Sequence, residues 1–141
     1  MARDGEIAVT TSPLMDSAGV VTLAIDDDPV DPEDPRLFHK TDDRGRYDDR
    51  LARYPEVDDL VLVNRRGEAT ETTIANLMVR LDGAWYTPPL DSGCLPGIYR
   101  EVALESGRVT ERVITLDDLG RAEELAVANS VRLWCPARLA G

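Results

Sequence analysis

The fold is decided by the stretch ATETTIANLMVRLDGAWYTPPLDSGCLPGIYR, residues 69–100. Two strand-like runs flank Asp82 and Gly83, a pair that strongly favours a two-residue hairpin turn. Two consecutive prolines end the second run. The segment LPGIYR then opens a helix, because proline is favoured in the first helical turn. A hairpin followed by a short helix predicts a mixed α+β fold.

The rest of the chain continues this alternation of short strands and short helices. Strands are predicted at 6–10, 19–25, 59–64, 68–72, 75–81, 84–87, 108–114, 124–129 and 131–139. Helices are predicted at about 97–105, ending at Gly107, and at 116–123. We therefore expect one α+β domain whose sheet forms a pseudo-barrel.

Two segments near the start are less regular. Residues 26–37 carry proline at every third position from Pro29 to Pro35, which indicates a stiff acidic connector; a ligand for a proline-reading domain is the less common alternative. Residues 37–54 are interpreted as a strand end that runs into a helix. Thr41 or Asp42 would cap this helix and Gly45 would weaken its middle.

Composition and charge indicate an acidic domain that binds neither nucleic acid nor a membrane. The 141 residues carry a formal net charge of −11, whereas phosphate backbones and anionic membranes need a basic face. A hydrophobic content of 43% with 5% aromatic residues predicts an aliphatic core. No run reaches the length of a membrane span, and the first residues lack a signal-peptide pattern, so we expect a cytoplasmic protein.

The cysteines do not predict a metal site. Cys94 and Cys135 lie far apart in the sequence, and His39 is the one histidine, so these residues do not complete a zinc-binding set. We expect both cysteines to be reduced thiols in the core.

Lysine usage singles out one residue. Fifteen of the 16 basic residues are arginine, and Lys40 is the one lysine. Arginine does not readily lose its proton, so the one lysine is the candidate side chain for an amine nucleophile. From composition alone, Lys40 is either a candidate for amine chemistry or, more commonly, a solvated surface charge.

Two other features suggest binding groups for the same ligand. Glu71 offers a carboxylate to a cation, and the backbone N–H groups of Gly97, Ile98 and Tyr99 at a helix start favour an anion such as phosphate. Pyridoxal 5'-phosphate combines an aldehyde for a lysine, a protonatable ring nitrogen and a phosphate. Each feature alone is weak evidence for a ligand. A glutamate in a hairpin is usually solvated, and a helix start usually binds no ligand.

The order of these motifs resembles the carboxy-terminal half of class IV pyridoxal-phosphate enzymes, the family of branched-chain aminotransferases, D-amino acid transaminases and aminodeoxychorismate lyases. The matching motifs are His39-Lys40-Thr41 with Arg44, GEATETTIANL at 67–77, TPPLDSGCLPGIYR at 87–100 and Ala128-Asn129-Ser130. The resemblance implies the α+β pseudo-barrel domain of the D-amino acid aminotransferase-like fold. We expect residues 20–141 to form the cofactor-binding domain and residues 1–19 to be a remnant of the interdomain or amino-terminal region.

The resemblance implies a role for each matching residue. Lys40 bonds to the cofactor aldehyde and moves the proton at the substrate α-carbon, and Glu71 pairs with the pyridine nitrogen. The remaining cofactor contacts are Leu95 on the ring and, at the phosphate, Gly97, Ile98, Tyr99 and Ser130, the last of which could equally be a plain strand serine. Arg44 and Asn76 are interpreted as residues that support the site, although a surface arginine is an equal alternative for Arg44.

By this resemblance, family members have an amino-terminal domain that closes the active site, and we expect this chain to lack it. Residues 1–14 look like the tail of that domain, so we expect a fragment, a split gene product or the end of a fusion. Expected partners are a second copy in a homodimer, the missing domain or a chorismate-using synthase. The leading function is an aminodeoxychorismate lyase that converts 4-amino-4-deoxychorismate to 4-aminobenzoate and pyruvate for folate biosynthesis. A branched-chain or D-amino acid aminotransferase and a catalytically silent assembly module are the alternatives.

Overall fold

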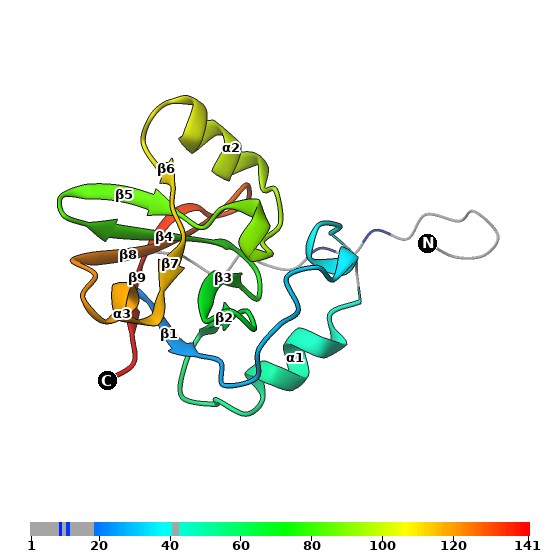
Figure 1. The fold of residues 1–141 in the computed structure, drawn as a ribbon. Helices are drawn as coiled ribbons and strands as arrows, with labels where there is room; N and C mark the ends of the chain where they lie inside the picture. The colour runs from blue at the N-terminus through cyan, green and yellow to red at the C-terminus, as the bar shows by residue number, and fades with distance from the viewer. Residues whose placement is uncertain (1–8, 10, 12–18, 41–42) are drawn as a thin grey trace.

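Six strands close into a barrel in the computed structural model, which describes residues 9, 11, 19–40 and 43–141. The barrel strands are β1 (Val21–Ile25), β2 (Asp59–Val63), β3 (Glu68–Thr72), β4 (Asn76–Leu81), β8 (Glu124–Asn129) and β9 (Leu133–Leu139). They pair in the order β4-β8-β9-β1-β2-β3, and a β3–β4 pairing closes the ring (Figure 1). β1 is parallel to both neighbours and the other pairs are antiparallel. The expected α+β pseudo-barrel is confirmed.

The predicted hairpin turn forms between β4 and β5 (Ala84–Thr87). Asp82 has a φ of 51° and Gly83 a φ of 79°, the left-handed pair that a two-residue hairpin turn of this type requires.

Aliphatic side chains fill the barrel, as the low aromatic content predicted. Along β4, Leu77, Val79 and Leu81 are buried in the interior cluster, which also contains Leu23, Val61, Ala69, Ala75, Ile114, Leu119, Leu125, Val127 and Cys135. Met78, between two of these positions, belongs instead to a cluster outside the barrel. This alternation follows from the period of two in a β-strand.

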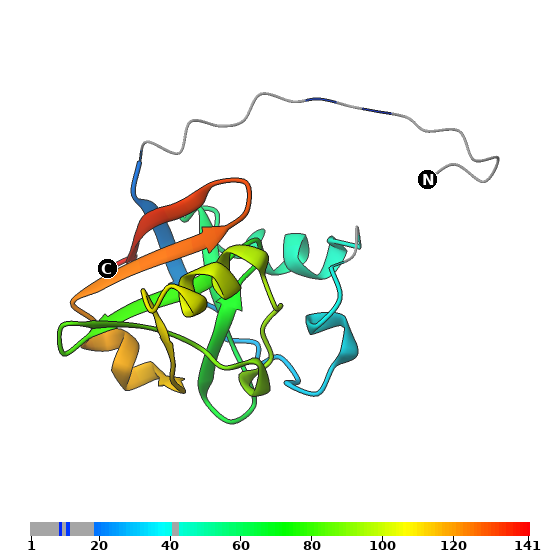
Figure 2. The same cartoon turned by 90° about the horizontal axis from the view of Figure 1, so that it is seen from above.

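In the part of the chain that the structure describes, three α-helices and two 3-10 turns surround the barrel. They are α1 (Gly45–Leu51), α2 (Ile98–Glu105), α3 (Leu116–Gly120), η1 (Pro35–Leu37) and η2 (Leu90–Ser92). α2 packs over the outer face of β4 and β8 (Figures 1 and 2), where Ala103 meets Met78 and Ala126. Gly107, with a φ of 72°, ends this helical segment as predicted. No helix in the described part of the chain is long and apolar enough to cross a membrane.

The prediction of a single strand at 108–114 is wrong. Two short strands form instead: β6 (Thr110–Glu111) pairs with β5, and β7 (Ile114–Thr115) pairs with β3. The chain crosses between the two ends of the sheet within these few residues, so no continuous ladder forms. The helix expected at 116–123 is also shorter, because α3 ends at Gly120.

The segment before α1 also differs from expectation. The strand end expected at residue 37 is the 3-10 turn η1, capped by Asp34, whose carboxylate accepts the Arg36 N–H at 3.0 Å. Gly45 begins α1 rather than weakening its middle. The expected caps Thr41 and Asp42 lie outside the described residues, as does the strand expected at 6–10 apart from Val9.

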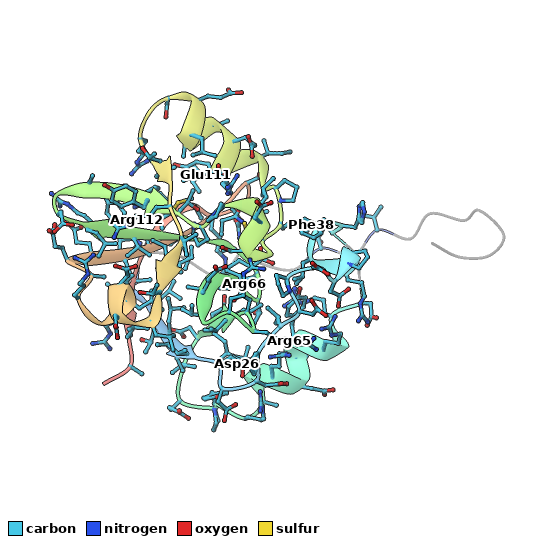
Figure 3. All side chains as sticks on the ribbon, viewed as in Figure 1. Asp26, Phe38, Arg65, Arg66, Glu111 and Arg112 are labelled. Carbon is cyan, nitrogen blue, oxygen red and sulfur yellow. The ribbon has the colours of Figure 1, made fainter. Side chains whose placement is uncertain are left out.

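α1 is held against the loop that follows β1 by a buried carboxylate. The Asp26 side chain, labelled in Figure 3, is fully buried and binds Arg50 of α1 and Arg53 in the turn that follows α1, the latter at 2.7 Å. Burying a carboxylate requires such paired partners. These ion pairs fix the position of α1 against this loop.

Candidate functional site

Glu71 and Asn76 face each other across β3 and β4 and together bind one residue of the loop before α2. They are direct partners in the strand pairing. Glu71 Oε2 accepts the Leu95 N–H at 2.9 Å, and Asn76 Nδ2 donates to the Leu95 carbonyl oxygen at 2.9 Å. The two side chains therefore fix both backbone polar groups of Leu95, and with them the start of α2.

Gly97 lets the helix start lie directly on Asn76. A Cβ at position 97 would lie 2.2 Å from Asn76 Oδ1, a separation that no side chain tolerates. Gly97 is also the N-cap of α2 and offers no side-chain hydrogen bond to the helix. The first-turn N–H groups at Ile98 and Tyr99 are therefore not capped by this residue, and the helix dipole favours an anion in front of them.

Glu71 is a buried carboxyl whose Oε1 accepts no hydrogen bond from the described residues. Glu71 is 7% exposed, and this burial raises the pKa of its carboxyl to about 8. The hydrogen bond from the Leu95 N–H lowers the pKa and so partly offsets the effect of burial. The negative charge of Asp59 raises this pKa further, and Arg100 lowers it. Among the described residues, no ion pair joins Glu71 to a basic side chain, and Oε1 accepts no hydrogen bond. The usual solvated glutamate is excluded by this burial.

The segment that carries Lys40 returns to this region through α1. Arg44 Nη1 donates to the carbonyl oxygen of Thr73 at 3.4 Å, two residues after Glu71. Tyr47 is half-buried, and burial together with the nearby charge of Glu71 raises the pKa of its phenol. Lys40 itself is exposed and lies in irregular structure after η1.

Ser130 lies in the turn between β8 and β9 and is exposed. Its neighbour Asn129 donates from Nδ2 to the carbonyl oxygen of Ile74 at 3.2 Å. The side chains of Arg44 and Asn129 thus both donate to backbone carbonyl oxygens in the turn between β3 and β4. Within the described part of the chain, neither the Lys40 nor the Ser130 side chain hydrogen-bonds to Glu71 or to α2.

Comparison with known proteins identifies the family. The family described as amino-transferase class IV matches residues 4–140. The chain belongs to the class IV aminotransferases. Members of this family are pyridoxal-phosphate enzymes.

Several relatives of this class IV chain are named for different activities. A Schizosaccharomyces pombe protein named "Putative aminodeoxychorismate lyase" is 30% identical over 96% of this chain and 62% of its own. A Thermotoga maritima protein named "Probable branched-chain-amino-acid aminotransferase" is 34% identical over 67% of this chain and 37% of its own. A Mesorhizobium loti structure titled as a "Putative amino-acid aminotransferase" has a TM-score of 0.84 at 36% identity, covering 99% of this chain and 70% of that one. The chain therefore spans less than two thirds of the length of these two curated relatives.

Three residues of the class IV site region were missed by the sequence interpretation. Arg100 is 1% exposed and is held by the Pro88 carbonyl oxygen at 3.0 Å, by Glu101 and by Glu111, which is labelled in Figure 3. Asp59 and Thr73 hydrogen-bond to each other below the β3–β4 turn. Two features of the sequence could have pointed to Arg100 and Asp59: an arginine inside the helix-start motif LPGIYR, and an aspartate directly before the apolar run LVLV.

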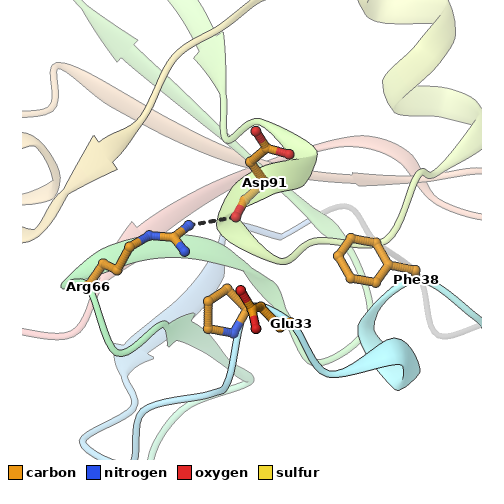
Figure 4. Close-up of a pocket in the computed structure, with 5 residues that line it drawn as sticks. Glu33, Phe38, Arg66 and Asp91 are labelled. Carbon is orange, nitrogen blue, oxygen red and sulfur yellow. Dashed lines mark hydrogen bonds between the residues drawn. The ribbon is translucent and has the colours of Figure 1, made fainter.

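The hollow in Figure 4 is separate from these groups. It has a volume of about 490 Å³ and is lined by Pro32, Glu33, Phe38, Arg66 and Asp91. Arg66 Nη2 donates to the Asp91 carbonyl oxygen at 2.6 Å across it. None of the predicted site residues lines this hollow, so we place the candidate site at Glu71 and the start of α2.

The buried state of Glu71 predicts a specific dependence of stability on pH. Its folded pKa of about 8 lies above the ordinary 4.5, so the native state keeps a proton that the unfolded chain releases. Wild-type stability relative to Glu71→Gln should be greatest below about pH 4.5 and fall as pH rises to about 8, by at most about 1.4 kcal/mol per pH unit. Urea unfolding of both proteins across this range measures the difference.

Glu68→Gln provides the matched control. Hydrogen bonds from Arg66, Asn64 and Ser92 lower the pKa of Glu68 to about 2, so its contribution is lost only as pH falls from about 4.5 toward 2. Above about pH 5, the difference in unfolding free energy between Glu68→Gln and wild type should stay constant. A flat profile for Glu71→Gln as well would contradict a buried, unpaired Glu71.

Proposed function

We propose that this chain forms the cofactor-binding half of a pyridoxal-phosphate active site, and that the complete enzyme is a 4-amino-4-deoxychorismate lyase. The observation that carries the proposal is the buried Glu71 carboxyl, which is tied through Leu95 to an uncapped helix start. The S. pombe relative supports the lyase assignment over most of the chain.

The residues present fit the cofactor. Glu71 has an oxygen acceptor that no basic side chain among the described residues pairs with, which suits a protonated ring nitrogen. The absent Cβ of Gly97 lets the backbone of the helix start approach a phosphate, with N–H donors at Ile98 and Tyr99. Leu95 is half-buried between these two groups and offers an apolar side chain to a ring.

Each residue then has a chemical task. Bound here, pyridoxal phosphate supplies an electron sink for the electron pair released at the substrate α-carbon. Glu71 holds the proton at the ring nitrogen, and the α2 backbone orients the phosphate. The Lys40 amine would hold the cofactor at its aldehyde group and would carry protons between substrate atoms. 4-Aminobenzoate and pyruvate together contain all atoms of 4-amino-4-deoxychorismate, so the lyase reaction needs no co-reactant.

An aminotransferase is the second candidate, favoured by the Thermotoga maritima and Mesorhizobium loti relatives. It would use the same cofactor groups on a branched-chain or D-amino acid. The groups identified here contact the cofactor rather than the substrate side chain. Substrate choice therefore falls to the part of the longer relatives that this chain does not match.

One pair of assays tests the proposal. The purified chain, loaded with pyridoxal phosphate, is incubated with 4-amino-4-deoxychorismate, and pyruvate and 4-aminobenzoate are measured together. A parallel reaction contains an amino acid and a 2-oxo acid. Equal release of pyruvate and 4-aminobenzoate supports the lyase, whereas transfer of the amino group to the 2-oxo acid replaces it with the aminotransferase. Absence of cofactor binding together with stable binding to a chorismate-using synthase would support the silent assembly module instead.

A further inference from the structure

The proline-spaced connector, residues 26–37, is fixed against the barrel by its own backbone and side chains. The Val30 N–H donates to the Val63 carbonyl oxygen at 2.8 Å, as in a short extension of the sheet. Val30 and Leu37 are each 2% exposed, and both pack in a small cluster with Leu62 of β2. The connector therefore holds a fixed course up to its last residue, which lies three positions before the one lysine.

The second half of this connector lies directly on the backbone of Gly93, in the loop between η2 and α2. A Cβ at position 93 would lie 2.9 Å from Pro32 Cα and 3.1 Å from Leu37 Cδ1. The first separation is shorter than Cβ atoms tolerate, and no side-chain rotation moves a backbone atom away. Gly93 also has a φ of 98°, a conformation that glycine adopts without strain. Position 93 therefore needs glycine for its backbone conformation and for this contact.

The contact at Gly93 joins the two segments that carry the proposed cofactor groups. On one side, Leu37 precedes Lys40 by three residues. On the other side, Gly93 precedes Leu95 by two residues, and the Leu95 N–H donates to Glu71 at 2.9 Å. Because both intervals are short, a displacement of the connector at Gly93 should move the lysine relative to the start of α2.

An ion pair anchors the connector a second time. The Asp34 carboxylate caps η1 and also binds Arg46 of α1 at 3.0 Å. η1 ends before Lys40 in the sequence and α1 begins after it. The chain is thus anchored on both sides of the lysine, and Gly93 is where the first of these anchors meets the loop that leads to α2.

We propose that Gly93 is a positioning residue: its bare backbone seats the connector and thereby sets the position of Lys40 relative to Glu71 and the start of α2. This inference rests on the proposed function. Proline limits the backbone freedom of the connector, so the connector can transmit a position from Gly93 to the lysine. When the amine reacts with an aldehyde, its nitrogen replaces the aldehyde oxygen, which leaves as water. That reaction depends on where the amine lies, and not only on how tightly the ring and the phosphate are held.

Two ligands separate these contributions. Pyridoxal phosphate would use the lysine as well as the ring and phosphate groups, whereas deoxypyridoxine phosphate has a methyl group in place of the aldehyde. The ratio of their dissociation constants therefore measures the contribution of the lysine. In Gly93→Ala and in Leu37→Ala, pyridoxal phosphate should lose affinity relative to deoxypyridoxine phosphate by about tenfold or more. Equal weakening of both ligands would show damage to the ring and phosphate groups alone and would overturn the inference.

Each variant has a matched control. Gly83 in the β4–β5 turn has a φ of 79°, but a Cβ there meets no atom within 4 Å, so Gly83→Ala adds backbone strain without a contact. Leu119 of α3 is 3% exposed and belongs to the barrel interior rather than to the cluster of Leu37, so Leu119→Ala also removes a buried leucine side chain. Both controls should lose stability and keep the wild-type ratio of dissociation constants. A ratio that falls as far in the controls would reduce Gly93 to a structural role.

Amide hydrogen exchange without ligand separates this inference from the proposed function. The Phe38 N–H donates to the Pro35 carbonyl oxygen at 3.1 Å, so its exchange rate reports how firmly the end of the connector is held. This rate should rise about tenfold or more in Gly93→Ala, and it should rise less in Gly83→Ala. Equal rates in the two variants would overturn the seat at Gly93, whether or not the cofactor binds. A wild-type chain that binds neither ligand would overturn the proposed function, and the exchange rates would still decide whether Gly93 holds the connector.

Discussion

Replacing Lys40 with methionine is expected to abolish turnover, lowering kcat by about 10³-fold or more, because Lys40 is the one lysine and no other side chain supplies both the amine nucleophile and the proton carrier. The fold should not change, since Lys40 is exposed and outside any helix or strand. Its free energy of unfolding should stay within about 0.5 kcal/mol of wild type. Steady-state kinetics and urea unfolding measure the two effects separately.

Lys40→Arg is the matched control for charge. Arginine keeps a positive charge at this position but does not lose its proton near neutral pH, so it should be as inactive as methionine. Turnover retained by either variant would remove Lys40 from the chemistry and return it to the role of a surface charge.

Gly97→Ala is expected to have the second largest effect. The added Cβ would lie 2.2 Å from Asn76 Oδ1, so either α2 moves or Asn76 releases the Leu95 carbonyl oxygen. We expect a loss of stability of about 1–3 kcal/mol, as for other overpacked sites. Binding of pyridoxal phosphate should weaken as well, because the N–H donors of the helix start are displaced. Thermal unfolding and cofactor titration measure both.

Two variants show whether the clash is the cause. In Gly120→Ala, the new Cβ meets no atom within 4 Å, so this change should be nearly neutral. Asn76→Ala removes the oxygen that Gly97→Ala would strike, so the double variant should lose less than the sum of the two single losses. Additive losses, or a Gly97→Ala protein that binds the cofactor like wild type, would show that the close approach is unimportant.

Local signals predicted the central part of this fold well. Asp82 and Gly83 marked the β4–β5 turn, and LPGIYR marked the start of α2, because turn and cap preferences act within a few residues. The split of residues 108–114 into β6 and β7 was not predictable in this way. It depends on pairing with β5 and β3, which are distant in sequence.

The candidate site shows the same division. Glu71, Gly97 and their neighbourhood followed from motif order, but the burial of Glu71 is set by the closed barrel and by α2. Asp59 resembled an ordinary acidic residue before a strand. Its hydrogen bonds reach Thr73, fourteen residues further along the chain.

The most direct measurement combines cofactor binding with mapping of the attached residue. The purified chain is mixed with pyridoxal phosphate, its visible spectrum is recorded, and borohydride reduction is followed by peptide mass spectrometry, with Lys40→Met as the control. Our account predicts a visible absorption band and a pyridoxyl group on Lys40, both absent from the variant. A label confined to the amino terminus, or no band in the wild-type chain, would contradict the assignment of this domain as the cofactor-binding half of the enzyme.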